Sequence, residues 1–333
     1  MTGISGFAGS HLAEALLHEG AEVHGLVHEG PPRPNLRAIE ADLALHSANL
    51  LDLDGTRRAV RDARPEVVFH LAAQPVPAQS WRDPRATVEV NVLGTLDLLE
   101  ALRDLASGPL LVLASSAEVY APDEGEAPLR EDHPLGPDNP YAASKVAQET
   151  LVDQYARAGV IRCVILRAAN QLGPRLHPEL VASAFARQIV RAEGGGERVV
   201  RVGNLSARRD FVDVRDMARA YVLAAERAEP GHAYDSEAGD ARPKSARVYN
   251  VGTGSAVPIR TILDLLVAES RVPVEVREDP ARRRPDDRPA LALDASAFRE
   301  RTSWAPAIPL RRSVRDTLEH WRLAAAVHAP QAS

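Results

Sequence analysis

Hydrophobic residues in the first half of the chain form short continuous runs, separated by longer stretches with apolar residues at helical spacing. Continuous apolar runs are typical of parallel strands buried on both faces. We therefore expect the following elements in chain order: a strand at Glu22–Val27, a helix at Thr56–Ala63, a strand at Val67–Leu71, a helix at Val88–Leu105, a strand at Leu110–Ala114, a helix at Pro140–Arg157 and a strand at Val160–Leu166.

Strand–helix alternation at this spacing predicts βαβ units and a doubly wound α/β domain. The pattern loosens after Asn170, so we expect a main domain over 1–170 and a smaller mixed α/β domain over 171–333, from which 211–229 and 246–252 return to the first. Polar Gly231–Ser245 is predicted to be a surface loop. The second half is expected to hold helices at Glu179–Ala192, Val214–Arg227, Ile259–Ser270 and Leu310–Ala325, and strands at Val199–Val202, Val248–Val251 and Val274–Arg277.

Composition narrows the class of protein. The 333 residues include 40 basic and 46 acidic side chains, a net charge of −6 that argues against a nucleic-acid binder. No apolar run is long enough for a membrane span. The single cysteine, Cys163, excludes an internal disulfide and a cysteine-based metal site, and we expect no metal and a cytoplasmic location. Only two basic residues, Lys145 and Lys244, are lysines.

The glycine series Gly3-x-x-Gly6-x-x-Gly9 directly precedes an apolar helical stretch. Such glycines permit a tight turn and a close approach of backbone to a pyrophosphate, which then meets the positive end of the helix. The spacing alone also arises by chance in a chain with 21 glycines. The strand–helix order that follows favours nucleotide binding in a Rossmann-type fold.

Only Met1 and Thr2 stand before Gly3, where a buried strand of about 4–6 residues is expected. Loss of a central strand would leave backbone N–H and C=O groups of the neighbouring strands without hydrogen-bond partners. We therefore expect the natural chain to begin several apolar residues earlier.

Tyr141 and Lys145 lie four residues apart near the start of a predicted helix, so both side chains share one face. An ammonium group near a phenol lowers the pKa of the phenol, which brings a tyrosine closer to useful proton transfer. The pair is also common on exposed helices, but lysine is rare in this chain. Ser116, at the carboxyl end of the Leu110–Ala114 strand, is a candidate hydrogen-bond donor to a carbonyl oxygen, because ligands of open α/β sheets bind at such ends.

These features, with the segments His70-Leu-Ala-Ala-Gln74 and Ser115-Ser-Ala-Glu-Val-Tyr120, resemble the extended short-chain dehydrogenase/reductase family of nucleotide-sugar enzymes. The resemblance implies a catalytic set of Ser116, Tyr141, Lys145 and Glu118. It also implies NAD(P)H as cofactor, bound by Gly3, Ser5, Gly6, Phe7, Gly9, His28, Asn49, Leu50, Leu71, Ala72, Ala73, Tyr141 and Lys145. The nucleotide-sugar substrate would be bound by Gln74, Ser116, Glu118, Asn170, Arg209 and Arg284.

Within that family the chain is most similar to GDP-4-keto-6-deoxy-D-mannose reductases and GDP-mannose 4,6-dehydratases, through Ser80-Trp81, Arg209-Asp-Phe211 and Pro280-Ala-Arg-Arg-Arg-Pro285. His28 stands where an acid favours NAD and a cation favours NADP, so the cofactor preference is open. Asn49 replaces an aspartate that is usual beside adenine. Ala168-Ala169 replaces bulkier residues, which widens the expected pocket.

Glu118 bears on the reaction, because sugar dehydratases use a glutamate at this place to eliminate water. The segment Asn170-Gln-Leu-Gly-Pro174 favours reduction of a nucleotide-linked 4-keto-6-deoxyhexose, and the expected case is GDP-4-keto-6-deoxy-D-mannose to GDP-D-rhamnose. Dehydration of GDP-mannose, or another epimerase or dehydratase reaction, is the alternative. A third possibility is a non-catalytic dinucleotide sensor. The resemblance also implies a homodimer through a four-helix bundle made from the Asn91 and Tyr141 helices.

Overall fold

The computed structural model describes residues 1–30, 32–105, 107–123, 125, 127–228, 246–282 and 288–328. Its strands are β1 (His24–Val27), β2 (Ala44–Ser47), β3 (Val67–His70), β4 (Leu110–Ser116), β5 (Arg162–Ala168), β6 (Asn170–Leu172), β7 (Val199–Val202), β8 (Arg208–Asp213), β9 (Arg247–Val251), β10 (Ala256–Pro258), β11 (Glu275–Glu278) and β12 (Ala290–Leu291). Its α-helices are α1 (Phe7–His18), α2 (Leu53–Ala63), α3 (Pro77–Arg82), α4 (Pro84–Val88), α5 (Gly94–Arg103), α6 (Pro140–Arg157), α7 (Val181–Glu193), α8 (Val214–Arg227), α9 (Ile259–Ala268), α10 (Ser296–Thr302) and α11 (Leu310–His328).

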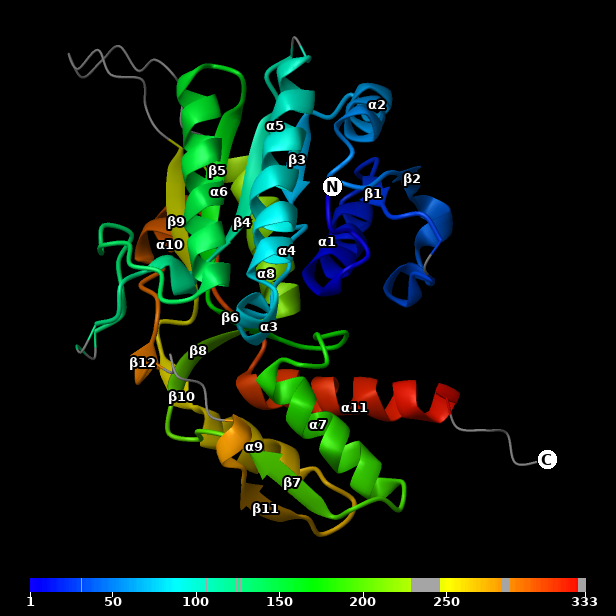
Figure 1. Ribbon diagram of the computed structural model, residues 1–333, viewed down its shortest axis with the longest axis vertical. Coiled ribbons are helices and arrows are strands. Elements are labelled where there is room, and N and C mark those ends of the chain that lie inside the picture. Colours follow the sequence, from blue (N-terminus) through cyan, green and yellow to red (C-terminus); the bar gives the residue numbers. More distant parts are fainter. Residues whose placement is uncertain are drawn as a thin grey trace.

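The apolar runs of the first half form a parallel sheet (Figure 1). Strands β3, β4, β5 and β9 pair in that order, and every pair is parallel. Strands β1 and β2 form a second parallel pair. Thr2 makes parallel bridges to both Leu26 and His70, so it joins the two groups of strands. The Met1 amino group donates to the His24 carbonyl at 2.7 Å.

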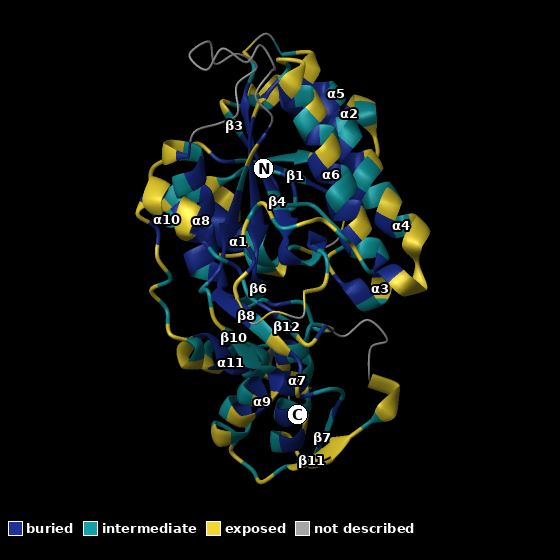
Figure 2. Ribbon diagram, turned by 90° about the vertical axis from the view of Figure 1, so that its left-hand side faces the viewer, coloured by how far each residue is buried: buried dark blue, intermediate teal, exposed yellow. Residues whose placement is uncertain are grey.

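Helices cover both faces of this sheet, because its central strand is apolar on both sides (Figure 2). Along β4, Leu111 and Leu113 belong to the core under α5 and α6. Leu110 and Val112 belong to the core under α1 and α8. This division follows from the two-residue period of a strand. The predicted doubly wound α/β fold is confirmed.

The second half of the chain builds a smaller layer beside the carboxyl ends of the parallel strands (Figure 1). Strand β8 pairs antiparallel with β10 and parallel with β6 and β12, and β7 pairs parallel with β11. Helices α7, α9 and α11 enclose a separate apolar core that contains Phe185, Ile262 and Leu318. The division of domains at residue 170 stays a prediction.

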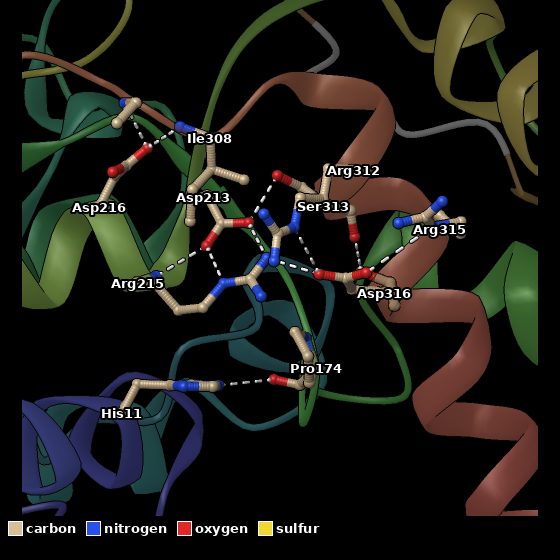
Figure 3. Close-up of polar contacts among 12 residues, drawn as sticks. His11, Pro174, Asp213, Arg215, Asp216, Ile308, Arg312, Ser313, Arg315 and Asp316 are labelled. Carbon is tan, nitrogen blue, oxygen red and sulfur yellow. Dashed lines mark hydrogen bonds and ion pairs between the residues drawn. The ribbon is translucent and has the colours of Figure 1, made fainter.

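A polar cluster ties β8, α8 and α11 together (Figure 3). Asp213 caps α8 by accepting from the Arg215 backbone at 2.8 Å, and it forms two further hydrogen bonds with the Arg215 guanidinium. Ser313 in α11 donates to the same carboxylate at 2.6 Å, and Arg215 also pairs with Asp316 at 2.8 Å. Close by, His11 in α1 contacts the Pro174 carbonyl at 3.1 Å. The cluster therefore joins α8 to α11, and the His11 contact joins α1 to the segment that follows β6.

Several predicted elements occur with the expected bounds, namely Pro140–Arg157, Val199–Val202 and Val214–Arg227. The helix expected at Val88–Leu105 is different. It starts at Pro84, passes through a π-helical turn at Glu89–Leu93 and ends at Arg103. Strands β2, β6, β8, β10 and β12 were not predicted. The loop predicted at Gly231–Ser245 lies outside the described residues.

The structure also bears on membrane spans and on the single cysteine. Among the described residues no helix is long and apolar enough to cross a membrane. Cys163 is buried in β5, and burial raises the pKa of its thiol. A buried thiol of this kind is unreactive.

Candidate functional site

The glycine series forms a tight turn between the start of the chain and α1. Gly3 has a φ of +69°, and a Cβ on it would lie 2.7 Å from the backbone nitrogen of Ala72. A Cβ on Gly9 would collide with the Gly3 carbonyl. Helix α1 begins at Phe7 with Gly6 as its N-cap residue and no side-chain cap. The first N–H groups of the helix are therefore not capped by a side chain, as a phosphate-binding turn requires.

This turn borders a cavity of about 600 Å³ at the carboxyl ends of the parallel strands. The structure brings most of the predicted site residues together on its wall. They are Gly3, Ser5, Gly6, Phe7, Gly9, His28, Leu50, Leu71, Ala72, Ala73, Ser116, Glu118, Tyr141, Lys145, Asn170 and Arg209. Arg284 lies outside the described residues.

Two predicted residues do not line the cavity. The exposed Asn49 accepts a hydrogen bond from the Leu51 backbone at 3.0 Å and so closes a turn. The amide of Gln74 bonds to the Val76 backbone in its own loop and to Thr87 in α4 at 3.1 Å. Local polar partners hold both side chains, and their roles in binding cofactor and substrate stay predictions.

Ser116, Tyr141 and Lys145 meet at the end of β4. Tyr141 stands near the start of α6, and its hydroxyl is hydrogen-bonded to the Ser116 side chain. The Lys145 ammonium lies 6.0 Å from the centre of the Tyr141 ring. The same ammonium donates to the Ala114 carbonyl at 2.9 Å, which fixes it beside β4. The predicted trio therefore shares one corner of the cavity.

The predicted lowering of the Tyr141 pKa by Lys145 is wrong for the protein alone. Burial raises the pKa of Tyr141 to about 12; the hydrogen bond with Ser116 opposes this shift, and the charge of Glu118 adds to it. Burial also lowers the pKa of Lys145 to about 8, against the attraction of Glu149. The ammonium is bonded to the Ala114 carbonyl and lies 6.0 Å from the ring centre, and it does not offset the desolvation of the phenol.

Glu118 lies on the cavity wall two residues beyond Ser116. Its backbone N–H donates to the Ser116 hydroxyl at 3.2 Å. Its carboxylate accepts from the Asn139 amide at 2.9 Å. Asn139 is also the N-cap of α6, where it accepts from the Ala142 backbone at 2.9 Å. One side chain therefore positions Glu118 relative to the helix that carries Tyr141.

Sequence reasoning missed several polar residues of the cavity: Gln171, His177, Glu179, Arg201, Asn204, Tyr221 and Arg282. Arg201 is a charged residue inside an apolar strand. This contrast could have identified it from the sequence as a candidate site residue. Tyr221 is hydrogen-bonded to Gln171, and burial raises its pKa. Its position on the apolar face of α8 is also that of an ordinary core residue, so the sequence held no signal for it.

The residues of the cavity fit a dinucleotide. The turn at Gly3 and Gly9 leaves no room for a Cβ, and the uncapped start of α1 suits a pyrophosphate. The walls beside it, from Leu71 to Ala73 and at Leu50, are apolar and suit a flat base. Among the described residues no group of three or more acidic, histidine or cysteine side chains is placed to hold a metal ion.

Comparison with known proteins identifies the family. The family profile described as GDP-mannose 4,6 dehydratase matches residues 1–317. The chain belongs to the GDP-mannose 4,6 dehydratase family. The GDP-6-deoxy-D-mannose reductase of Pseudomonas aeruginosa is 32% identical to this chain over 323 residues, with 96% of each chain covered.

Solved structures agree with this membership. The structure of RMD from Pseudomonas aeruginosa complexed with NADPH is similar to this chain with a TM-score of 0.79 and 29% identity, over 97% of each chain. The Thermus thermophilus UDP-glucose 4-epimerase in complex with NAD is similar with a TM-score of 0.81 and 31% identity, over 96% of this chain and 97% of the other. As a member of the GDP-mannose 4,6 dehydratase family, the chain is an NAD(P)-dependent enzyme that acts on nucleotide sugars.

Proposed function

We propose that this enzyme uses NADPH or NADH to reduce the C4 ketone of a nucleotide-linked 4-keto-6-deoxyhexose. GDP-4-keto-6-deoxy-D-mannose is the proposed substrate and GDP-D-rhamnose the proposed product. The likeness to the Pseudomonas aeruginosa reductase over almost the whole chain supports this choice.

The undissociated Tyr141 hydroxyl carries the proposal. Reduction of a ketone creates an alkoxide that needs a proton, and with a pKa of about 12 Tyr141 is protonated at neutral pH. An alcohol is a weaker acid than this phenol, so transfer from Tyr141 to the alkoxide is downhill. Epimerases and dehydratases instead begin by removing a proton from the C4 hydroxyl, a step that needs the phenolate form of the tyrosine.

The nicotinamide ring, when bound, supplies the hydride. Tyr141 protonates the oxygen on C4, and Ser116 donates a hydrogen bond to the same oxygen. Lys145 orients the ribose of the cofactor and assists Tyr141. Asn170 and Arg209 bind the nucleotide diphosphate and sugar, with Arg284 as the further residue of that set, because guanidinium groups match phosphate oxygens.

Glu118 favours a second candidate function, the dehydration of GDP-mannose. Its carboxylate lines the cavity near Tyr141 and is held by Asn139, so an acid–base group is available for elimination. In the reductase proposal Glu118 bonds to a hydroxyl of the sugar instead.

Two incubations separate the two functions. The enzyme is mixed with NADPH and GDP-4-keto-6-deoxy-D-mannose, the absorbance of the reduced cofactor is followed, and the product is identified by NMR. The reductase consumes one cofactor for each GDP-D-rhamnose formed. If GDP-mannose alone is converted to the 4-keto sugar with no net change of cofactor, the dehydratase function is correct.

The Tyr141→Phe variant tests the remaining possibility of a dinucleotide sensor without turnover. General acid catalysis contributes about 10²–10⁴-fold to a rate, so the variant is expected to lose that factor in kcat and keep its affinity for NADPH. A biological activity that is unchanged in the variant would support the sensor.

We also propose a cytoplasmic homodimer that forms through the surface of α4, α5 and α6. Val88 and Leu93 on this surface are 44% and 47% exposed, which suits burial against a second copy. Sedimentation of the Leu93→Glu variant tests this proposal, with a shift from dimer to monomer as the expected result.

A further inference from the structure

A buried ion pair lies directly behind the candidate catalytic corner. Arg167 of β5 donates to both carboxylate oxygens of Glu149 in α6, at 2.7 Å and 3.0 Å. The two side chains are 6% and 7% exposed. Such a two-point pair holds its partners in a fixed orientation.

The pair is connected to the end of β4. Ser115 donates to the Glu149 carboxylate at 2.5 Å, and Ser115 is the pairing partner of Arg167 in the parallel ladder. Lys145, one turn before Glu149 in α6, bonds to the carbonyl of Ala114. Helix α6 and strand β5 therefore hold the two residues that directly precede Ser116.

The pair also sets the charge around Lys145. Burial lowers the pKa of Lys145 to about 8, and the charge that opposes this shift comes from Glu149. Tyr141, with a pKa of about 12, and His70, whose pKa burial lowers to about 3, face the same ammonium as neutral groups at pH 7. Arg167 stands on the far side of the carboxylate and keeps it in place.

We propose that Glu149 and Arg167 are positioning residues: the buried pair places a carboxylate one turn from Lys145 in α6, and through Ser115 it fixes the end of β4 that carries Ser116. Neither side chain lines the cavity, so both act through other residues. The effect on turnover rests on the proposed reductase function. The effect on Lys145 does not depend on the identity of the sugar.

Two variants keep this proposal testable. Glu149→Gln removes the counter-charge but leaves Arg167 buried without its carboxylate, which destabilises a fold. The double variant Glu149→Gln with Arg167→Met removes both charges, a change that folds usually tolerate. The matched control is Glu193→Gln, because Glu193 and Arg322 form a similar pair, 9% and 10% exposed, between α7 and α11.

The direct measurement is an NMR titration of lysine side chains in protein labelled with ¹³C-lysine. The chain has only two lysines, and a Lys244→Arg variant assigns the Lys145 signal. We expect a Lys145 midpoint near 8, as burial lowers its pKa to about 8, a downward shift of that midpoint in the double variant and no shift in Glu193→Gln. An unchanged Lys145 midpoint in the double variant would overturn the proposal.

The pH profile of kcat provides the second readout. In the double variant the alkaline limb of the profile is expected to shift to lower pH together with the Lys145 midpoint. In Glu193→Gln it is expected to stay at the same pH. Ser115→Ala is expected to lower kcat by about tenfold, about 1.4 kcal/mol, and to leave the alkaline limb unmoved. A profile that does not follow the Lys145 midpoint would contradict the role in catalysis. If the chosen sugar is not turned over at all, the proposed function fails while the NMR titration still decides the role of Glu149.

Discussion

The Asn139 side-chain amide donates to the Glu118 carboxylate at 2.9 Å. The oxygen of the same amide accepts from the Ala142 backbone and so caps α6. This one side chain links the acid of the cavity to the first turn of the helix that carries Tyr141. The spacing between Glu118 and Tyr141 therefore depends on Asn139.

Replacement of Asn139 by serine separates its two tasks. Serine retains a helix cap but is too short to reach Glu118, so the free energy of unfolding should change by less than about 1 kcal/mol. We expect kcat to fall by about tenfold, the effect of about 1.4 kcal/mol of lost positioning. Thermal unfolding and steady-state kinetics measure the two effects. Equal kcat values for the variant and the wild type would show that Glu118 needs no such support.

Gly3→Ala is expected to abolish binding of NADPH. A Cβ on Gly3 would lie 2.7 Å from the Ala72 backbone and would push apart the turn that meets the pyrophosphate. Gly20→Ala is the matched control, because Gly20 also has a positive φ, +79°, but no atom lies within 4 Å of its added Cβ. Fluorescence titration with NADPH should give a loss of affinity of at least ~100-fold in the first variant, about 2.7 kcal/mol, and none in the control. Equal affinities would place the cofactor elsewhere.

His28 is expected to control the choice of cofactor. It follows β1 and lines the cavity, where an acid would bond to a ribose 2′-hydroxyl and a cation would pair with a 2′-phosphate. We predict that His28→Asp shifts the ratio of kcat/KM values toward NADH, and that His28→Arg shifts it toward NADPH, each by roughly tenfold. The same ratio in both variants would show that the 2′ position lies away from this residue.

His70 should make the fold sensitive to acid. It lies between the hydroxyls of Thr2 and Thr95, at 2.7 Å and 2.8 Å, and burial lowers its pKa to about 3. The unfolded chain takes up a proton on this ring below about pH 6.5, and the folded chain does not. The free energy of unfolding therefore rises between about pH 3 and pH 6.5. Above that range the full contribution of His70 to stability is present.

Urea unfolding at pH 7, 6 and 5 measures this effect. Relative to His70→Gln, the wild type should lose about 1.4 kcal/mol more between pH 6 and 5. The control is His18→Gln, since the His18 side chain is 88% exposed. Parallel curves for the wild type and His70→Gln would contradict this prediction.

The sequence predicted the parallel sheet well because its strands are continuous apolar runs. Strand β8 escaped prediction, because it begins with Arg208 and Arg209 and its buried Asp210 gives it a polar appearance. Asp210 is buried because the Thr253 side chain and the backbones of Gly254 and Leu293 donate to it. Those partners come from distant parts of the chain, which no local pattern reveals.

In the candidate site, too, local features were predictable and features that depend on distant contacts were not. The glycine turn and the Tyr141–Lys145 pair were predictable, because turn geometry and helical spacing are local properties. Gln74 was assigned to the substrate, but Thr87 in α4 holds its amide. The raised pKa of Tyr141 likewise depends on burial that only the assembled layers produce.

The fate of the hydride tests the central proposal most directly. The enzyme is incubated with GDP-4-keto-6-deoxy-D-mannose and NADPH that carries deuterium in the transferable C4 position, and the sugar is analysed by NMR and mass spectrometry. Reduction predicts one deuterium on C4 of each GDP-D-rhamnose and one oxidised cofactor for each product. A product without deuterium at C4, or no net oxidation of the cofactor, would contradict the proposed function.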